Sequence, residues 1–197
     1  STHEFGTVCQ WAIQMINIVT GNLDRVGGVM LTNPAIDAVG RGLLGRGHIG
    51  RFRSRVRDLP EFGGELPVSA LREEIETPGE GQIRAMLTLS GNPVLSTPDG
   101  AALDRALGTV DFMAAIDIYV NETTRHADVI LPSTTALERD HYDLAFHVLA
   151  VRNTARFTPA LFPKGKDQRH DWEIFREVAM RVLARVDTKP SLKRRLA

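Results

Sequence analysis

Three short apolar runs between polar segments constrain the fold of this chain more than any other feature. They are IRAMLTLSG at residues 83–91, FMAAIDIYV at 112–120 and ADVILP at 127–132. Each run has the length and composition of a buried strand. Between the first two runs, Asp99 can cap a helix that extends to about Leu107. Strands therefore alternate with helices, which is typical of a parallel sheet.

Helical periodicity marks both ends of the chain. Residues 6–20 carry apolar side chains around most of the helix circumference, which predicts a helix buried between layers. Asp171 precedes the amphipathic segment WEIFREVAMRVLARV. Its predicted apolar face consists of Trp172, Phe175, Val178, Ala179 and Val182. Together these elements predict an α/β fold, with a three-layer, mostly parallel, Rossmann-like sheet flanked by helices.

Residues 22–82 show little periodicity. Nine of the 17 glycines lie between Gly27 and Gly64, so most of this segment is predicted to be irregular, closing with a short helix around residues 68–75. A long loop in a compact domain usually has a function or packs on something else. The predicted parts are residues 1–82, a helix plus an irregular Gly/Arg-rich segment packing on the domain, and residues 83–197, an α/β nucleotide-binding region.

Polar loops follow all three predicted strands. The first strand runs into SGNPVLSTPDG, the second into a loop after Asp117, and the third into PSTTALERDHYD. Ligands of open α/β sheets bind beyond the carboxyl ends of the strands, so these loops are predicted to converge on one ligand, although ordinary capping loops look the same. Asp117 lies late in an apolar run, where a buried carboxylate needs a donor. The N1–H and N2–H groups of guanine would suit it.

The stretch GRGLLGRGHIG contains the dinucleotide fingerprint G-x-G-x-x-G twice, from Gly40 and from Gly45. A true fingerprint follows a buried strand and opens a helix. Here NPAIDAV precedes the stretch and RFRSRVRD follows it, and neither has the required pattern. We therefore interpret both matches as chance occurrences in a glycine-rich loop.

The same region is strongly basic. From Arg41 to Arg57 there are six arginines and no acidic residue, a local formal charge of +6. Such a run is found at nucleic-acid contacts and also in solvated or partner-facing loops. The formal net charge of the whole chain is zero, and Phe52 is the only aromatic residue in the run, which favours the second interpretation.

Composition limits the class of protein. Hydrophobic residues make up 43% of the 197, enough for a sizeable core, and no apolar run reaches the roughly 20 residues of a membrane span. A single cysteine, Cys9, cannot form an internal disulfide, which fits a reducing compartment. We therefore expect a cytoplasmic protein that binds neither nucleic acid nor membrane.

Several segments, taken together and in order, resemble the molybdopterin oxidoreductase family, which includes formate dehydrogenases, nitrate reductases and dimethyl sulfoxide reductases. They are MINIVTGNLDRVGGVM, SGNPVLSTPDG, FMAAIDIYVNETTRHADVILPSTTALERDHYD and RHDWEIFREVA. The resemblance implies that the chain is a fragment of a catalytic subunit several times longer. In that subunit, two molybdopterin guanine dinucleotides hold molybdenum or tungsten.

The resemblance also implies that this chain binds one of the two dinucleotides. The implied cofactor-binding residues are Gly91, Asn92, Ser96, Asp117, Asn121, Glu122, Thr123, Ser133, Arg139 and Asp171. Asp117 aligns with the aspartate that recognises guanine in the family. Arg139 stands where other members often have lysine, and the geometry of its hydrogen bonds differs accordingly. Asp171 matches an aspartate that contacts guanine, and a helix N-cap explains it equally well.

The resemblance implies no catalytic or metal-ligating residue in this chain. Cys9 matches no ligand position, and His126 and His141 match no catalytic one. We therefore expect the chain alone to hold no metal and to be inactive as an oxidoreductase. Its expected partners are the remainder of the same catalytic chain and an electron-transfer subunit.

Two other functions remain open at this point. The chain is alternatively a partner-subunit interaction module, which docks through its Arg-rich loop and binds no nucleotide in isolation. A nicotinamide dehydrogenase that uses Gly40 to Gly50 is the third possibility, and the context of the fingerprint argues against it.

Overall fold

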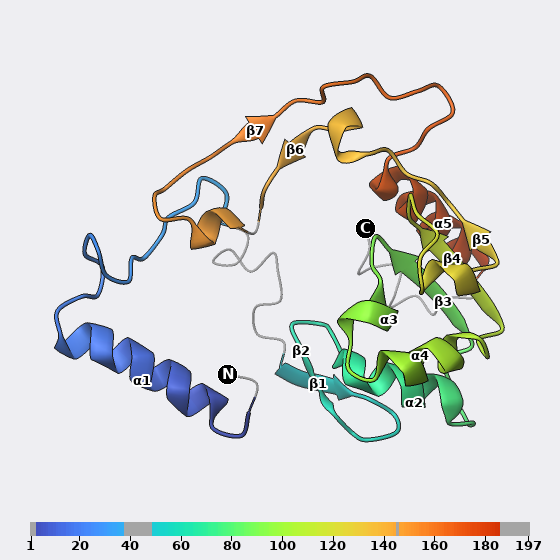
Figure 1. Ribbon diagram of the computed structural model, residues 1–197, viewed down its shortest axis with the longest axis horizontal. Coiled ribbons are helices and arrows are strands. Elements are labelled where there is room, and N and C mark those ends of the chain that lie inside the picture. Colours follow the sequence, from blue (N-terminus) through green and yellow to red (C-terminus); the bar gives the residue numbers. More distant parts are fainter. Residues whose placement is uncertain (1–2, 38–48, 145, 186–197) are drawn as a thin grey trace. The chain divides into compact units, whose positions relative to one another are not determined.

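Figure 1 shows the computed structural model of the chain, in which residues 3–37, 49–144 and 146–185 are described. The chain forms two compact units. The first comprises residues 1–44 and 142–157, and the second comprises residues 45–141 and 158–197. The predicted parts, 1–82 and 83–197, follow a different division of the chain and stay a prediction.

The second unit is built on a three-stranded parallel sheet in the order β3-β4-β5. Its strands are β3 (Ala85–Leu89), β4 (Phe112–Ile116) and β5 (Val129–Ile130). Leu89 pairs with Ile116, so β3 and β4 end together. The three predicted strands are confirmed. They are shorter than the apolar runs because each run continues into the loop after its strand.

Short helices cover one face of this sheet. They are the 3-10 helix η1 (Val68–Ala70), α2 (Leu71–Glu76), α3 (Pro93–Ser96) and α4 (Gly100–Leu107). The predicted helices around 68–75 and up to Leu107 are thus confirmed. The buried core between helices and sheet consists of Ile75, Val94, Leu103, Ala106, Leu107 and Met113. Burial of these side chains is the main term that stabilises the unit.

The turn from α3 into α4 differs from the predicted cap. Asp99 is the N-cap residue, but its side chain makes no capping hydrogen bond, because its backbone is left-handed (φ +55°). Gly100 follows it, and a Cβ atom at this position would lie 1.9 Å from the carbonyl oxygen of Val94. Close approach of the two helices therefore requires glycine here.

The last helix of the unit, α5 (Asp171–Arg185), begins where the sequence predicts. Ile174 and Val178 of this helix line a pocket together with Leu131, the residue after β5. The predicted apolar face is only partly correct, since Trp172 and Phe175 are more than half exposed. The structure is thus a parallel sheet flanked by helices, and the three-layer Rossmann-like arrangement stays a prediction.

Part of the Arg-rich segment is regular. Strands β1 (Ile49–Arg53) and β2 (Pro60–Phe62) form an antiparallel hairpin, so the prediction of an irregular segment is wrong here. The pairs Arg53–Asp58 (3.2 Å), Arg55–Glu74 (3.3 Å) and Arg57–Glu73 join arginines of the run to acidic residues. At least three of the six positive charges that accumulate along the sequence are therefore compensated in space.

Glu74 anchors the hairpin segment to α2. Its side chain is 8% exposed, accepts a hydrogen bond from Arg55 Nε, and accepts another from the backbone N–H of Val56 at 2.9 Å. Arg55 also donates from Nη2 to the carbonyl oxygen of Thr77 at 2.7 Å. Two elements that are 18 residues apart are thus held together through one carboxylate.

Both fingerprint matches begin in residues 38–48, which lie outside the described residues, as do Arg41 and Arg46. Gly50, the last glycine of the second match, lies in β1. No helix follows it, because β1 continues to Arg53.

The first unit contains α1 (Gly6–Val19), which confirms the predicted helix but not its burial. Gly6 is its one buried residue, while Val8, Trp11 and Ile16 are exposed. The described part of the unit holds no second α-helix to cover these side chains. Its other elements are the 3-10 helix η4 (Phe146–Leu149) and parts of the paired strands β6 (His141–Tyr142) and β7 (Phe157–Thr158).

No helix in the described ranges combines the length and the hydropathy that crossing a bilayer requires.

Replacing Glu74 by Ala should lower the free energy of unfolding by about 2–3 kcal/mol, because Arg55 loses its carboxylate partner and the N–H of Val56 loses its acceptor. Urea denaturation measures the loss. The matched control is Glu76→Ala on the same helix, which removes an exposed pair with Arg72 and should change stability by less than about 0.5 kcal/mol. Equal effects of the two substitutions would contradict the anchoring role.

Candidate functional site

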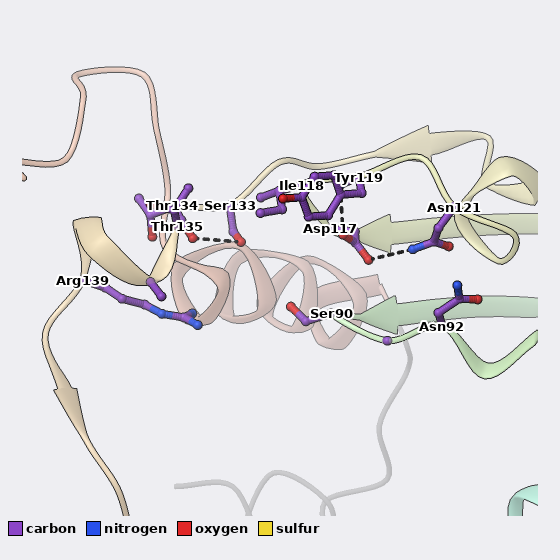
Figure 2. A pocket seen from close by; sticks show the side chains of 12 residues that line it. Ser90, Asn92, Asp117, Ile118, Tyr119, Asn121, Ser133, Thr134, Thr135 and Arg139 are labelled. Atoms are coloured by element: carbon purple, nitrogen blue, oxygen red, sulfur yellow. Dashed lines mark hydrogen bonds between the residues drawn. The ribbon is translucent and has the colours of Figure 1, made fainter. Parts of the chain in front are cut away.

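A pocket of about 360 Å³ lies where the strands of the parallel sheet end, and Figure 2 shows it from close by. Three loops line it, as predicted. Ser90, Gly91 and Asn92 follow β3; Asp117, Ile118, Tyr119 and Asn121 follow β4; Ser133, Thr134, Thr135, Ala136 and Arg139 follow β5. The volume is at the lower end of the range for small-molecule sites.

Asp117 is the carboxylate of this pocket and is 9% exposed. Its Oδ1 accepts a hydrogen bond from the backbone N–H of Tyr119 at 3.0 Å, and its Oδ2 accepts one from Asn121 Nδ2 at 3.4 Å (Figure 2). The donor that its burial requires is thus supplied by the loop itself. A carboxylate has about four acceptor positions, so Asp117 has capacity for two more donors.

Asn121 orients Asp117 and organises the loop after β4. Its Oδ1 accepts hydrogen bonds from the backbone N–H groups of Thr123 (3.0 Å) and Thr124 (2.9 Å). These bonds lie at the start of the 3-10 helix η2 (Thr124–His126). The side-chain nitrogen is thereby left to face Asp117, and together with the N–H of Tyr119 it orients the carboxylate.

Asn92 joins the loop after β3 to the loop after β4. Its Nδ2 donates to Glu122 at 2.7 Å, and its Oδ1 accepts from the hydroxyl of Thr123 at 2.7 Å. The same hydroxyl accepts from the N–H of Val94 at 3.1 Å, and Thr123 is 0% exposed. The hydrogen bond from Asn92 also lowers the pKa of Glu122. Glu122 and Thr123 therefore hold the two loops together and do not line the pocket.

The chain makes a tight turn where it leaves β3. Ser90 has a left-handed backbone (φ +47°) and donates its N–H to the carbonyl of Ile116 at 2.9 Å. At Gly91, a Cβ atom would meet nothing closer than the carbonyl oxygen of Leu89 at 3.6 Å. Packing within the protein therefore leaves room for a Cβ atom at Gly91, which lines the pocket. Ser96 is exposed, lies outside the pocket lining, and bonds back to the carbonyl of Asn92 at 3.1 Å.

The loop after β5 forms the far wall. Thr135 and Glu138 make a reciprocal capping box around the 3-10 helix η3 (Ala136–Glu138). Arg139 follows, and its Nη1 donates to Asp171 Oδ2 at 2.5 Å. Asp171 does not line the pocket, so the structure places it behind Arg139.

The segment that leads into α5 braces this wall. Gln168 Nε2 donates to Glu138 Oε1 at 3.0 Å, and the hydroxyl of Thr134 lies 2.8 Å from His170 Nδ1. The N–H of Thr135, and then the Gln168 amide, lower the pKa of Glu138. The ammonium of Lys164, and then the N–H of His170, lower the pKa of Glu173 on α5. Both glutamates are therefore ionised acceptors at neutral pH.

Six of the ten predicted site residues line the pocket, namely Gly91, Asn92, Asp117, Asn121, Ser133 and Arg139. Ser96, Glu122, Thr123 and Asp171 support it from outside. The sequence reasoning missed Thr135 and Glu138, although T-x-x-E is a detectable capping-box pattern. It also missed Ser90 and Tyr119, which carry no signal beyond their place next to predicted residues. Within the described residues, no group of three His, Cys, Asp or Glu side chains forms a metal site.

Comparison with known proteins relates the chain to one family. The family model described as molybdopterin oxidoreductase matches residues 1–181. The chain is 31% identical over 135 residues to the assimilatory nitrate reductase catalytic subunit of Bacillus subtilis (68% of this chain, 18% of that protein). It is 32% identical over 131 residues to formate dehydrogenase H of Escherichia coli (64% and 16%) and 30% identical over 124 residues to the NADPH-Fe(3+) oxidoreductase subunit alpha of Geobacter sulfurreducens (61% and 14%). The chain thus spans less than a fifth of the length of each of these relatives.

Replacing Thr123 by Val should lower the free energy of unfolding by about 2 kcal/mol, because Asn92 Oδ1 loses its donor and the buried N–H of Val94 loses its acceptor. Thermal or urea denaturation checks this. Ser96→Ala at the end of α3 removes one exposed hydrogen bond and should cost less than about 0.5 kcal/mol. A Thr123→Val variant as stable as the Ser96→Ala variant would show that this tie between the loops contributes little.

The stability of the protein should also depend on pH through Glu138 and Glu173, the two glutamates whose pKa values are lowered near the beginning of α5. The pKa values of Glu138 and Glu173 are lowered in the folded state, so their contribution is present above the usual glutamate pKa of 4.5 and is lost as the pH falls through the lowered values. The melting temperature of the double variant Glu138→Gln, Glu173→Gln should therefore lie below that of the unmodified protein at neutral pH. The gap should narrow on acidification below 4.5. A gap that is constant with pH would contradict this assignment.

Proposed function

The chain belongs to the molybdopterin oxidoreductase family, and from this premise we propose that it supplies the binding site for one molybdopterin guanine dinucleotide within a longer catalytic chain. The parent enzyme on this proposal resembles a formate dehydrogenase or a nitrate reductase, as two of its relatives are named. The remainder of that catalytic chain, together with an electron-transfer subunit, would be its partners.

The observation that carries the proposal is the burial, position and remaining acceptor capacity of Asp117. A buried carboxylate lies beyond the carboxyl end of a parallel strand, where such sheets bind ligands, and the N–H of Tyr119 and the amide of Asn121 orient it. Its remaining acceptor capacity matches two parallel N–H donors. Guanine presents such a pair in N1–H and N2–H, whereas adenine has no matching pair.

Other features of the pocket fit a nucleotide. The room beside Gly91 lets a ligand approach the backbone closely. Arg139 offers a planar cation of the kind that binds phosphate oxygens, and it lies on the opposite wall from the loop after β3. The site thus combines a base-recognising carboxylate with a phosphate-binding cation.

The cofactor and the residues of this chain have separate roles on this proposal. When bound, the cofactor supplies redox chemistry at its molybdenum or tungsten. The residues described above hold and orient the nucleotide end, and we assign no catalytic or metal-ligating role to any of them. The chain by itself is therefore expected to be inactive as an oxidoreductase.

The alternative function, an interaction module that docks through its Arg-rich loop, has less support. Arg53, Arg55 and Arg57 already pair with acidic residues of the same unit. These pairs offset part of the positive charge that would attract an acidic partner.

Replacing Asp117 by Asn should abolish the preference for guanine, because the new amide presents a donor to a guanine N–H. In the full-length enzyme prepared without cofactor, calorimetry with GDP and ADP measures this preference. Loss of about 3 kcal/mol of charge-assisted hydrogen bonding corresponds to roughly 100-fold weaker binding of GDP. Binding of ADP should change little.

The matched control is Asp99→Asn, which removes the same charge from an exposed position outside the pocket and keeps a residue that tolerates a left-handed backbone. It should leave binding of GDP unchanged. If the enzyme without cofactor shows no preference for GDP over ADP, or if the Asp117→Asn variant keeps that preference, the proposed function is wrong.

A further inference from the structure

Arg139 is the one cationic side chain among the described residues that line the pocket. Figure 2 shows it extending from the wall after β5 towards the side of Ser90. Within the described chain, its guanidinium donates one hydrogen bond, from Nη1 to Asp171 Oδ2. The guanidinium has five N–H groups, so four are left for a ligand.

Asp171 is itself held in place. Its Oδ1 accepts a hydrogen bond from the backbone N–H of Trp172 at 3.0 Å, and its Oδ2 accepts the one from Arg139. It is the first residue of the 15-residue helix α5, where the helix dipole favours a negative charge. Both oxygens of the carboxylate are therefore engaged with the protein, and the residue lies outside the pocket lining.

Two further contacts keep the beginning of α5 against the wall that carries Arg139. Gln168 binds Glu138, the residue immediately before Arg139, and His170 binds Thr134. Asp171 thus sits on a braced support and not on a free loop. Such a support is what a flexible cation needs to be held in one orientation.

We propose that Asp171 is a positioning residue: it orients Arg139 towards the diphosphate of a bound guanine nucleotide and does not touch the nucleotide itself. The inference rests on the proposed function and deepens it. It differs from the role that the sequence resemblance implies for Asp171, which is a direct contact with guanine.

Two effects of Asp171 oppose each other. Its carboxylate holds the side chain of Arg139 in one rotamer before the ligand binds, so less conformational entropy is lost on binding, which strengthens binding of phosphate. Its negative charge also offsets part of the positive charge of Arg139, which weakens that binding. The side chain of Arg139 is 39% exposed, so solvent screens its charge and orientation outweighs net charge. Removal of Asp171 should therefore weaken binding of phosphate groups.

The test compares guanosine with GDP on the full-length enzyme prepared without cofactor, at the site whose GDP binding is lost in Asp117→Asn. The Asp171→Asn variant should bind GDP about tenfold more weakly, while its affinity for guanosine, which lacks phosphate, stays within about twofold. The Arg139→Gln variant should lose at least as much affinity for GDP. The double variant should be no weaker than Arg139→Gln, because Asp171 acts through Arg139. Asp171→Glu, which keeps the carboxylate, should recover part of the loss.

The matched control is Asp111→Asn, which breaks a pair with Arg84 before the first residues of β3 and β4, at the amino ends of the sheet. It should leave both affinities unchanged. Equal losses for guanosine and GDP in Asp171→Asn, tighter binding of GDP, or additive losses in the double variant would each overturn the positioning role while leaving nucleotide binding in place. Absence of GDP binding in the unmodified protein would instead overturn the proposed function, and this inference with it.

Discussion

The site depends on the parallel, in-register pairing of β3 with β4. Leu89 lies opposite Ile116, so the chain leaves both strands at the same level of the sheet. The N–H of Ser90 extends the ladder by one bond, to the carbonyl of Ile116. Asp117 and the turn at Gly91 therefore start side by side, and the hydrogen bonds between Asn92 and Thr123 continue the alignment into the loops. A shift of one residue in this register would turn Asp117 to the other face of the sheet.

Much of the fold follows from local pattern in the sequence. Apolar runs identify β3, β4 and β5, and helical spacing identifies α1, α4 and α5, because each of these signals depends only on neighbouring residues. Asp117 is recognisable for the same reason, as a charge that ends an apolar run. The roles of Glu122 and Asp171 are not recognisable in this way. Whether a polar loop residue faces a ligand or another loop depends on partners about 30 residues away.

In the Arg-rich segment, too, the local sequence does not reveal which residues become neighbours, and here the consequence is electrostatic. Counted along the chain, the run carries a charge without compensation. In the folded unit, Arg55 and Arg57 meet Glu74 and Glu73, which lie 19 and 16 residues further on. A charge count in a sequence window misses such pairs, because folding decides which charges become neighbours. The hairpin at Ile49–Phe62 and its salt bridges are thus a tertiary property of this chain.

The contacts between the loop after β5 and the beginning of α5 bear on how the chain between them can change in length. Contacts from Thr134, Glu138 and Arg139 to residues 168–171 bring the two ends of an intervening segment together. That segment contains residues 142–157, which belong to the other compact unit. Because the contacts that hold Arg139 lie entirely within its own unit, a change of length between residues 142 and 157 should leave the geometry around Arg139 in place.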